Sequence, residues 1–285
     1  MSDQISSAGL LEGPAGAKVL EDALAHEPDI CPFVRWHLQR KFLVMEGLFR
    51  RYLAPHAKFV DIACGSGDGL LLASLCQSQS ELWGLDIDRP SLDLAKARVP
   101  AARLFKGDML RPDSLPKEYF DVVHEFGATF FVRNWGALAE VYLSLLREGG
   151  VLLWELPQKW SMGHISYMLS VAPKITAADT KVRRILRSFS PSKYMYETDQ
   201  AVLAALQATG CEYEVLERVP IWYFYCRGLL CKTLDLAWTF SGDAMFDWFD
   251  KVNGRIWPCY SGYYLVVRKK ASPNKPHYNS FKRIT

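Results

Sequence analysis

Three glycines at alternate positions mark the part of the chain best suited to hold a ligand. Gly65, Gly67 and Gly69 follow a strand pattern that ends in VDI, and a helical run of leucines begins at Leu70. A strand, a glycine-rich turn and a helix in this order form the front end of a nucleotide-binding α/β unit. The glycines let a ligand come close to the main chain, and the helix N-terminus offers unpaired N–H groups and the positive end of the helix dipole.

Carboxylates stand at the ends of the neighbouring strand patterns. Asp61 lies at the end of the first, Asp86 ends the second in LWGLDID, and Asp108 follows the third in GDM. A carboxylate at the end of the second strand can accept both hydrogen bonds of a ribose diol. The loop, GSGDG, differs from the GxGxxG of dinucleotide-binding proteins because its third glycine comes one residue early. The pattern therefore favours a nucleoside-containing ligand other than a dinucleotide.

An alternation of strands and helices must position these residues. Strands that alternate with helices favour a parallel sheet with helices on both of its faces. Strands are expected over residues 58–63, 81–86, 102–106, 119–125 and 151–156, with helices over 66–77, 90–98 and 135–147. A helix over 33–53 precedes this region, and helices over 160–171, 177–189 and 199–209 and strands over 212–219 and 260–268 follow it.

Five motifs in this order and spacing carry a family resemblance. VDIACGSGDG, LWGLDID, LFKGDML, EYFDVVHEFGATFF and LLREGGVLLWELP resemble the motifs of the class I, Rossmann-like family of S-adenosylmethionine-dependent methyltransferases. The resemblance covers residues 58–156. It implies an α/β, Rossmann-like three-layer sandwich with helical additions. The implied sheet is mostly parallel and seven-stranded, in the order 3-2-1-4-5-7-6 with the last strand antiparallel. It also implies S-adenosylmethionine as cofactor and S-adenosylhomocysteine as product, with no metal.

The resemblance also assigns roles by position. Asp61, Gly65 and Gly67, with Ala63 of the same loop, would line the methionine moiety of the cofactor. Asp86 would hold the ribose hydroxyls and Ile87 would pack on the adenine. Asp108 would accept from the adenine amino group, Met109 would lie on the other side of the ring, and Glu125 and Phe126 would lie beside the sulfonium.

Methyl transfer to a hydroxyl or a protonated amine benefits from a base. The candidates are Glu125, His164 and His37, each of which could instead orient the substrate. His124 and Glu125 must point to opposite faces of a regular strand, and Glu125 has the better position. His124 is therefore expected to be a buried histidine with satisfied ring nitrogens.

The chain is expected to form one domain with four parts. These are an N-terminal helical arm or lid (1–54), a cofactor-binding half (55–156), a substrate half with inserted helices (157–264), and a strand end with a basic tail (265–285). Residues 1–27 would be a mobile or loosely docked arm. The helix over 33–53 would pack on the domain edge with Lys41 and its other basic residues in water, or would close over the cofactor. The basic tail, which includes Lys269, would be solvated or loosely docked.

Composition excludes several classes of protein. The net charge of +3 is too small to predict nucleic-acid binding, and seven scattered cysteines favour free thiols over a disulfide framework. The start of the chain lacks the basic and apolar regions of a secretory signal. The most apolar stretch, residues 221–240, contains Arg227, Lys232 and Asp235 and makes a poor membrane span. A cytoplasmic protein is expected.

The expected activity is methyl transfer to an oxygen or nitrogen of a small, apolar or aromatic metabolite, such as one of secondary metabolism. The aromatic residues of 221–264 either pack in a core or form a pocket for an apolar group or a cationic amine. One alternative is a methyltransferase that acts on RNA or protein. The other is a protein that binds S-adenosylmethionine without transferring a methyl group, such as a cyclase or a pericyclic catalyst. The sequence leaves monomer and homodimer equally open.

Overall fold

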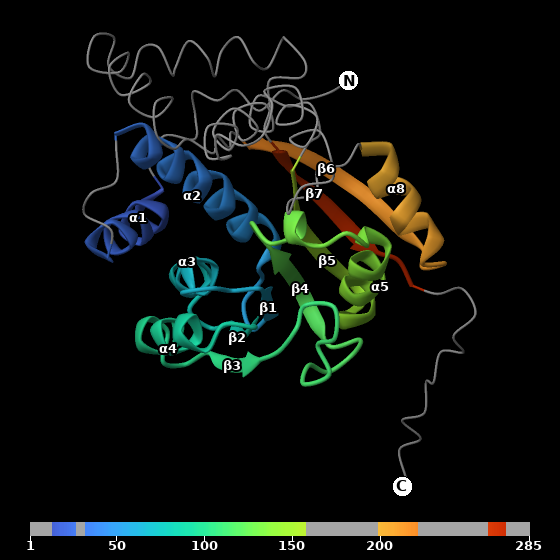
Figure 1. Ribbon diagram of the computed structural model, residues 1–285, viewed down its shortest axis with the longest axis horizontal. Coiled ribbons are helices and arrows are strands. Elements are labelled where there is room, and N and C mark those ends of the chain that lie inside the picture. The colour runs from blue at the N-terminus through green and yellow to red at the C-terminus, as the bar shows by residue number, and fades with distance from the viewer. Residues whose placement is uncertain (1–12, 27–31, 158–198, 222–261, 272–285) are drawn as a thin grey trace, which may run out of the picture.

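The computed structural model describes residues 13–26, 32–157, 199–221 and 262–271 (Figure 1). The helices expected over 160–171 and 177–189, and the aromatic-rich segment 222–261, lie outside the described residues. The described parts form one sheet with helices on both of its faces.

The sheet confirms the predicted topology. Its seven strands run in the order β3-β2-β1-β4-β5-β7-β6. The pairings among β1 to β5 are parallel, and β7 is antiparallel to both β5 and β6. The strands are β1 (Lys58–Ile62), β2 (Glu81–Asp86), β3 (Arg103–Lys106), β4 (Phe120–Glu125), β5 (Leu146–Pro157), β6 (Tyr213–Ile221) and β7 (Gly262–Lys269).

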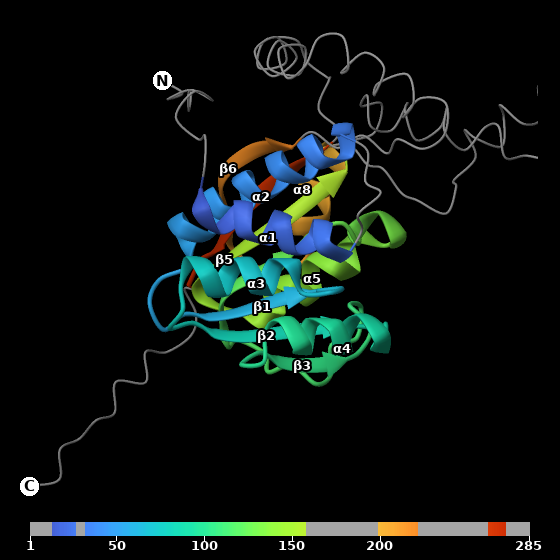
Figure 2. The same cartoon turned by 90° about the vertical axis from the view of Figure 1, so that its left-hand side faces the viewer.

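Helices cover the sheet in two layers (Figures 1 and 2). One hydrophobic cluster joins one face of the sheet to the first four helices, and a second joins the opposite face to α5 and α8. Central strands are apolar along most of their length because both of their faces are buried. The helices are α1 (Pro14–His26), α2 (Pro32–Tyr52), α3 (Asp68–Cys76), α4 (Arg89–Arg98), α5 (Trp135–Leu145) and α8 (Asp199–Ala208), with a short 3₁₀ helix, η2 (Thr129–Phe131), after β4.

β5 is longer than the sequence predicts. Residues 148–150, which fall between the expected helix over 135–147 and the expected strand over 151–156, lie inside the strand, which begins at Leu146. Phe120 faces Leu146 while Val122 faces Val151, so extra residues of β5 are accommodated in an irregularity of the ladder. Gly149 lies there with φ of 77°, a conformation that a residue with a Cβ adopts at a cost.

The N-terminal segment is more closely packed than expected for a loosely docked arm. Residues Ala15, Val19 and Leu20 of α1 are buried. The main-chain N–H of Gly16 donates to Glu46 of α2 at 2.7 Å, and a Cβ on Gly16 would lie 3.3 Å from the backbone of α2. α1 therefore belongs to the helical layer that covers β1.

Lys269 is buried, which corrects the prediction that the basic tail is solvated or loosely docked at this residue. It lies at the end of β7, and its Nζ donates to the main-chain oxygens of Leu143 and Leu146, both at 2.8 Å. An ammonium group at the end of a helix satisfies carbonyls that have no partner within the helix. Lys269 thus joins the last strand to the end of α5.

Candidate functional site

The glycine-rich loop leaves β1 in a strained conformation. Ala63 has φ of 57° although it carries a Cβ, and Gly65 and Gly67 follow at 52° and 86°. The N–H of Gly67 donates to the carbonyl of Cys64 at 2.9 Å, which closes the turn. A non-glycine residue in the left-handed region costs about 1–2 kcal/mol, so surrounding packing must hold Ala63 in place.

The glycines of the loop have different surroundings. A Cβ on Gly65 would meet no atom within 4 Å, so its main chain is open to a ligand. A Cβ on Gly67 would lie 2.9 Å from the Cβ of Ala95, and a Cβ on Gly69 would lie 2.4 Å from Oδ2 of Asp61. Gly67 therefore allows α4 to pack closely against the loop, a packing role that stands beside the ligand-lining role predicted for it.

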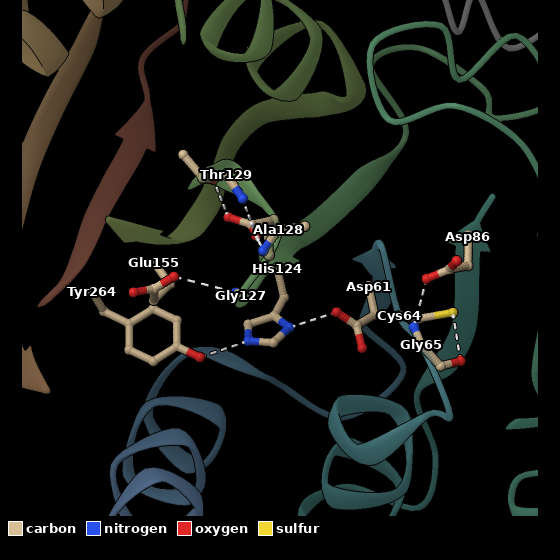
Figure 3. Close-up of polar contacts among 11 residues, drawn as sticks. Asp61, Cys64, Gly65, Asp86, His124, Gly127, Ala128, Thr129, Glu155 and Tyr264 are labelled. Atoms are coloured by element: carbon tan, nitrogen blue, oxygen red, sulfur yellow. Dashed lines mark hydrogen bonds and ion pairs between the residues drawn. The ribbon is translucent and has the colours of Figure 1, made fainter. Parts of the chain in front are cut away.

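Asp86 and Ile87 lie at the end of β2, next to this open backbone. One oxygen of Asp86 accepts from the N–H of Gly65 at 2.7 Å (Figure 3), and the other accepts from the N–H of Asp88 at 2.8 Å. Each carboxylate oxygen has a further lone pair with which it can accept from a ligand. The side chain of Ile87 is 68% exposed, which is unusual for so large an apolar group.

Asp108 and Met109 follow β3 at the same edge of the sheet. Asp108 accepts from the N–H of Leu110 at 2.9 Å, and its main chain forms an isolated bridge with Arg111. Met109 is partly buried against the hydrophobic cluster under α5. The structure thus brings both residues to the edge that carries Asp86, as the sequence predicts.

Asp61 is part of a buried hydrogen-bonded row that the sequence does not reveal. Its Oδ1 lies 2.7 Å from Nδ1 of His124, whose Nε2 lies 2.9 Å from the hydroxyl of Tyr264 (Figure 3). A neutral ring with its proton on Nδ1 satisfies both contacts, by donating to Asp61 and accepting from Tyr264. The prediction that His124 is a buried, satisfied histidine is confirmed, since only 1% of it is exposed.

Glu125 points to the opposite face, as predicted, and its carboxylate is fully buried. One oxygen accepts from the N–H groups of Ala128 and Thr129 at 2.6 and 3.0 Å, and the other accepts from the hydroxyl of Thr129. Trp154 donates to that same hydroxyl at 2.7 Å. Burial, followed by the charge of Glu155, raises the pKa of Glu125 from 4.5 to about 8. These hydrogen bonds stabilise the turn after β4, so Glu125 has a structural role in this turn.

Glu155 is the carboxyl group that sequence reasoning missed. It lies near the end of β5, directly opposite Tyr264 in the ladder, and is only 3% exposed. The N–H of Gly127 donates to its Oε2 at 3.2 Å (Figure 3). Burial raises its pKa from 4.5 to about 7, while the Gly127 N–H and the charge of Lys41 hold it lower. The sequence feature that could have identified it is a single acidic residue within LLWELP, an otherwise apolar strand.

Lys41 reaches this region from α2. Its Nζ lies 4.2 Å from the ring centroid of Phe126, the residue that follows β4, and 5.1 Å from that of Phe42. Burial lowers its pKa, and the carboxylates of Asp68, Asp61 and Glu155 act in the opposite direction. The side chain is therefore held against rings and near carboxylates, which corrects the expectation that it lies in water.

The structure does not describe the side chains of the other two candidate bases, His37 and His164. His37 belongs to α2, where the structure describes its backbone only, and His164 lies outside the described residues. Within the described ranges, no group of three or more His, Cys, Asp or Glu could hold a metal ion, and no helix is long and apolar enough to cross a membrane.

These strand ends fit S-adenosylmethionine. Main chain is open at Gly65 and Gly127, because a Cβ on either glycine would meet nothing within 4 Å. Carboxylates that can still accept lie beside an exposed apolar side chain, Ile87, as a ribose and a purine require. In open α/β sheets, ligands bind at this carboxyl edge, where the strand order reverses between β1 and β4.

Comparison with known proteins agrees with this geometry. Residues 59–150 match the family described as "Methyltransferase domain". Together with the motif series, the sheet order and the site at its carboxyl edge, this match identifies the family. Over these residues, the chain belongs to the class I, Rossmann-like family of S-adenosylmethionine-dependent methyltransferases.

Two curated relatives are sugar methyltransferases. The chain is 28% identical over 150 residues to dTDP-3-amino-3,6-dideoxy-alpha-D-glucopyranose N,N-dimethyltransferase of Streptomyces fradiae, covering 50% of this chain and 56% of that protein. It is 27% identical over 125 residues to dTDP-3-amino-3,4,6-trideoxy-alpha-D-glucopyranose N,N-dimethyltransferase of Streptomyces venezuelae, covering 42% and 52%. The alignments thus span about half the length of these relatives.

Among solved structures, the (4+2) cyclase SpnF shares the fold. The TM-score is 0.52 at 15% identity, and the match covers 82% of this chain and 84% of that chain. A likeness at this level of identity concerns the fold alone, so the same architecture serves more than one reaction.

Proposed function

We propose that the protein transfers a methyl group from S-adenosylmethionine to the nitrogen of a small metabolite that carries an amino group. The observation that carries the proposal is the buried carboxyl of Glu155, which lies near the end of β5, at the carboxyl edge of the sheet between β4 and β7. The expectation of an oxygen or nitrogen acceptor is thereby narrowed to nitrogen. The acceptor would be less apolar than the sequence suggests.

The residues around the glycine-rich loop would hold the cofactor. Asp86 would accept from the ribose hydroxyls, Ile87 would cover one face of the adenine, and Met109 would lie on the other. The open main chain at Gly65 would approach the methionine moiety. When bound, the cofactor supplies an electrophilic methyl group on a sulfonium that is a good leaving group.

The protein must then align the nitrogen behind the methyl group, exclude water and remove a proton. An alkylammonium group carries no lone pair for attack until it has lost a proton. We propose that the Glu155 carboxylate accepts this proton, because a base with a pKa close to the working pH transfers protons efficiently. The nitrogen lone pair then forms the new N–C bond, and the electrons of the broken C–S bond stay on sulfur.

Two further observations support an amine. A buried carboxylate beside the ring of Tyr264 offers charge and an apolar surface together, which suits a cationic nitrogen. The curated relatives are named for the dimethylation of amino sugars. A product with two methyl groups requires that the base act again after the first transfer, so it must lose its proton to solvent between the two steps.

The test is a panel of small acceptors incubated with the enzyme and S-adenosylmethionine. Thymidine-diphosphate amino sugars and simple aromatic amines would be compared with matched compounds that carry a hydroxyl in place of the amine. We expect S-adenosylhomocysteine and a product heavier by one or two methylene units with amines only. Transfer to the hydroxyl compounds alone would refute the choice of nitrogen. Conversion of an acceptor without formation of S-adenosylhomocysteine would favour a cyclase-like function.

A further inference from the structure

Arg98, at the end of α4, joins the glycine-rich loop to the N-terminal helix. Its side chain is only 10% exposed. One nitrogen, Nη1, donates to the main-chain oxygen of Ser66 at 2.7 Å, to the hydroxyl of Ser66 at 3.3 Å and to Oδ1 of Asp68 at 2.8 Å. Another, Nε, lies 2.6 Å from Oδ2 of Asp22 on α1 in an ion pair. A single enclosed guanidinium therefore serves two parts of the chain.

On the loop side, the contacts fix the part that faces the ligand. Ser66 stands between Gly65, whose main chain is open, and Gly67, which packs on α4. Asp68 begins α3, and its carboxylate would repel an anion at that helix N-terminus if it were not paired. The guanidinium neutralises this charge and holds the carbonyl of the loop at once, because its donors are fixed in one plane.

On the other side, Asp22 lies in the second half of α1. The first half of the helix is held separately, by the bond from Gly16 to Glu46 and by burial of Val19. Arg98 forms an ion pair that joins this second half to the loop, at a depth where a charge without its partner is costly. Undocking of α1 would remove one carboxylate from the guanidinium and leave the loop contacts to hold it alone.

We propose that Arg98 is a positioning residue for cofactor binding, and that it couples docking of α1 to the ligand-bound form of the glycine-rich loop. The inference rests on the proposed function, in which this loop binds the methionine end of S-adenosylmethionine. If a ligand stabilises the loop as Arg98 holds it, the same ligand stabilises docked α1. The reverse follows, because coupling between two sites is reciprocal.

The same helix offers a matched control. Arg89 pairs with Asp93 one turn along α4 at 3.0 Å, and both side chains are well exposed, at 68% and 61%. An exposed pair of this kind contributes little to stability. Arg89→Gln therefore removes the same chemical group from the same helix without touching the loop or α1.

The experiment compares wild type with Arg98→Gln, Arg98→Lys, Asp22→Asn and Arg89→Gln. Calorimetry would give the Kd of S-adenosylhomocysteine, and hydrogen exchange would report protection of residues 14–26 with and without it. We expect the Kd to rise about tenfold in Arg98→Gln, from the loss of charged hydrogen bonds to the loop, and about threefold in Asp22→Asn, from the loss of the ion pair, with an intermediate value for Arg98→Lys. Arg89→Gln should equal wild type.

In wild type, the ligand should increase protection of residues 14–26. This gain should be lost in Arg98→Gln and reduced in Asp22→Asn. Faster exchange of α1 in Asp22→Asn with an unchanged Kd would overturn the coupling, as would equal effects in Arg89→Gln. If Arg98→Gln fails to fold, the Kd and the exchange of residues 14–26 in Asp22→Asn test the coupling instead. Failure of wild type to bind S-adenosylhomocysteine would instead refute the proposed function, on which the inference rests.

Discussion

Replacement of Glu155 by Gln tests the proposed base. The substitution keeps the shape of the side chain but removes the group that can take a proton. A positioned general base contributes about 10²–10⁴-fold to a rate. Glu155 is 3% exposed and, within the described part of the chain, its hydrogen bond comes from Gly127, so solvent has little access to the site to take over as the base. We therefore expect kcat to fall about 10²-fold or more, with a smaller change in the KM of S-adenosylmethionine.

The pH dependence follows from the state of the carboxyl group. Glu155 acts as the carboxylate, so activity should be low in acid and should rise with pH through a limb near 7, where its pKa lies. Lys41 holds that pKa down, so Lys41→Met should move the limb to higher pH. Glu125 titrates close by, and the limb reports the pair rather than one residue.

Two assays measure these effects, with Glu140→Gln on the exposed surface of α5 as the control. The pH profile of S-adenosylhomocysteine formation would be recorded with the amine that the acceptor panel identifies. Carbon NMR of glutamate labelled at the side-chain carboxyl would follow the titration without substrate. In Glu155→Gln, the pKa of Glu125 should fall, because the charge of Glu155 raises it. A Glu155→Gln enzyme with wild-type kcat and an unchanged acid limb would refute the reasoning.

Other substitutions separate ligand contacts from packing. Gly65→Ala should lower the free energy of unfolding by only about 1–2 kcal/mol, because of its left-handed φ, but should weaken binding of S-adenosylhomocysteine. Gly67→Ala should lose about a further 1–3 kcal/mol, because its Cβ would clash with α4. Urea unfolding measures both losses. Tyr264→Phe leaves Nε2 of His124 without its donor and should lower the free energy of unfolding by about 1–3 kcal/mol; an unchanged unfolding midpoint would contradict the hydrogen bond. Lys269→Met should cost a similar amount, because two carbonyls at the end of α5 lose their partner, and stability equal to wild type would show that this tail residue is solvated after all.

The fold was predictable from the sequence because its signals are local. The alternation of strand and helix patterns from Lys58 to Leu156 predicts the parallel sheet, and the resemblance of the motifs to a known family implies the order of its strands. The bounds of β1 and β2 follow from short, mostly apolar runs, of which the first ends at Ile62 before the glycine-rich loop and the second ends at Asp86. The start of β5 was not predictable, because Gly149 and its neighbours resemble a turn and become part of the strand only through pairing with β4.

Much of the site depends on contacts between distant segments. Asp61 and His124 lie 63 residues apart, and Tyr264 lies a further 140 residues along, so no spacing rule connects them. Lys41 looks like a surface residue because helical periodicity describes one helix alone, whereas its environment is set by how α2 crosses the strand ends. Likewise, sequence alone does not distinguish a glycine that faces a ligand from one that faces Ala95.

The central claim is that the carboxyl edge of this sheet binds S-adenosylmethionine through the loop and Asp86. The most direct measurement is calorimetry of S-adenosylhomocysteine with wild type and with Asp86→Ala. We expect saturable binding at one site in wild type and a Kd at least about tenfold higher in Asp86→Ala, because two hydrogen bonds to a charged group are lost. No binding by wild type, or the same Kd in both proteins, would contradict the claim.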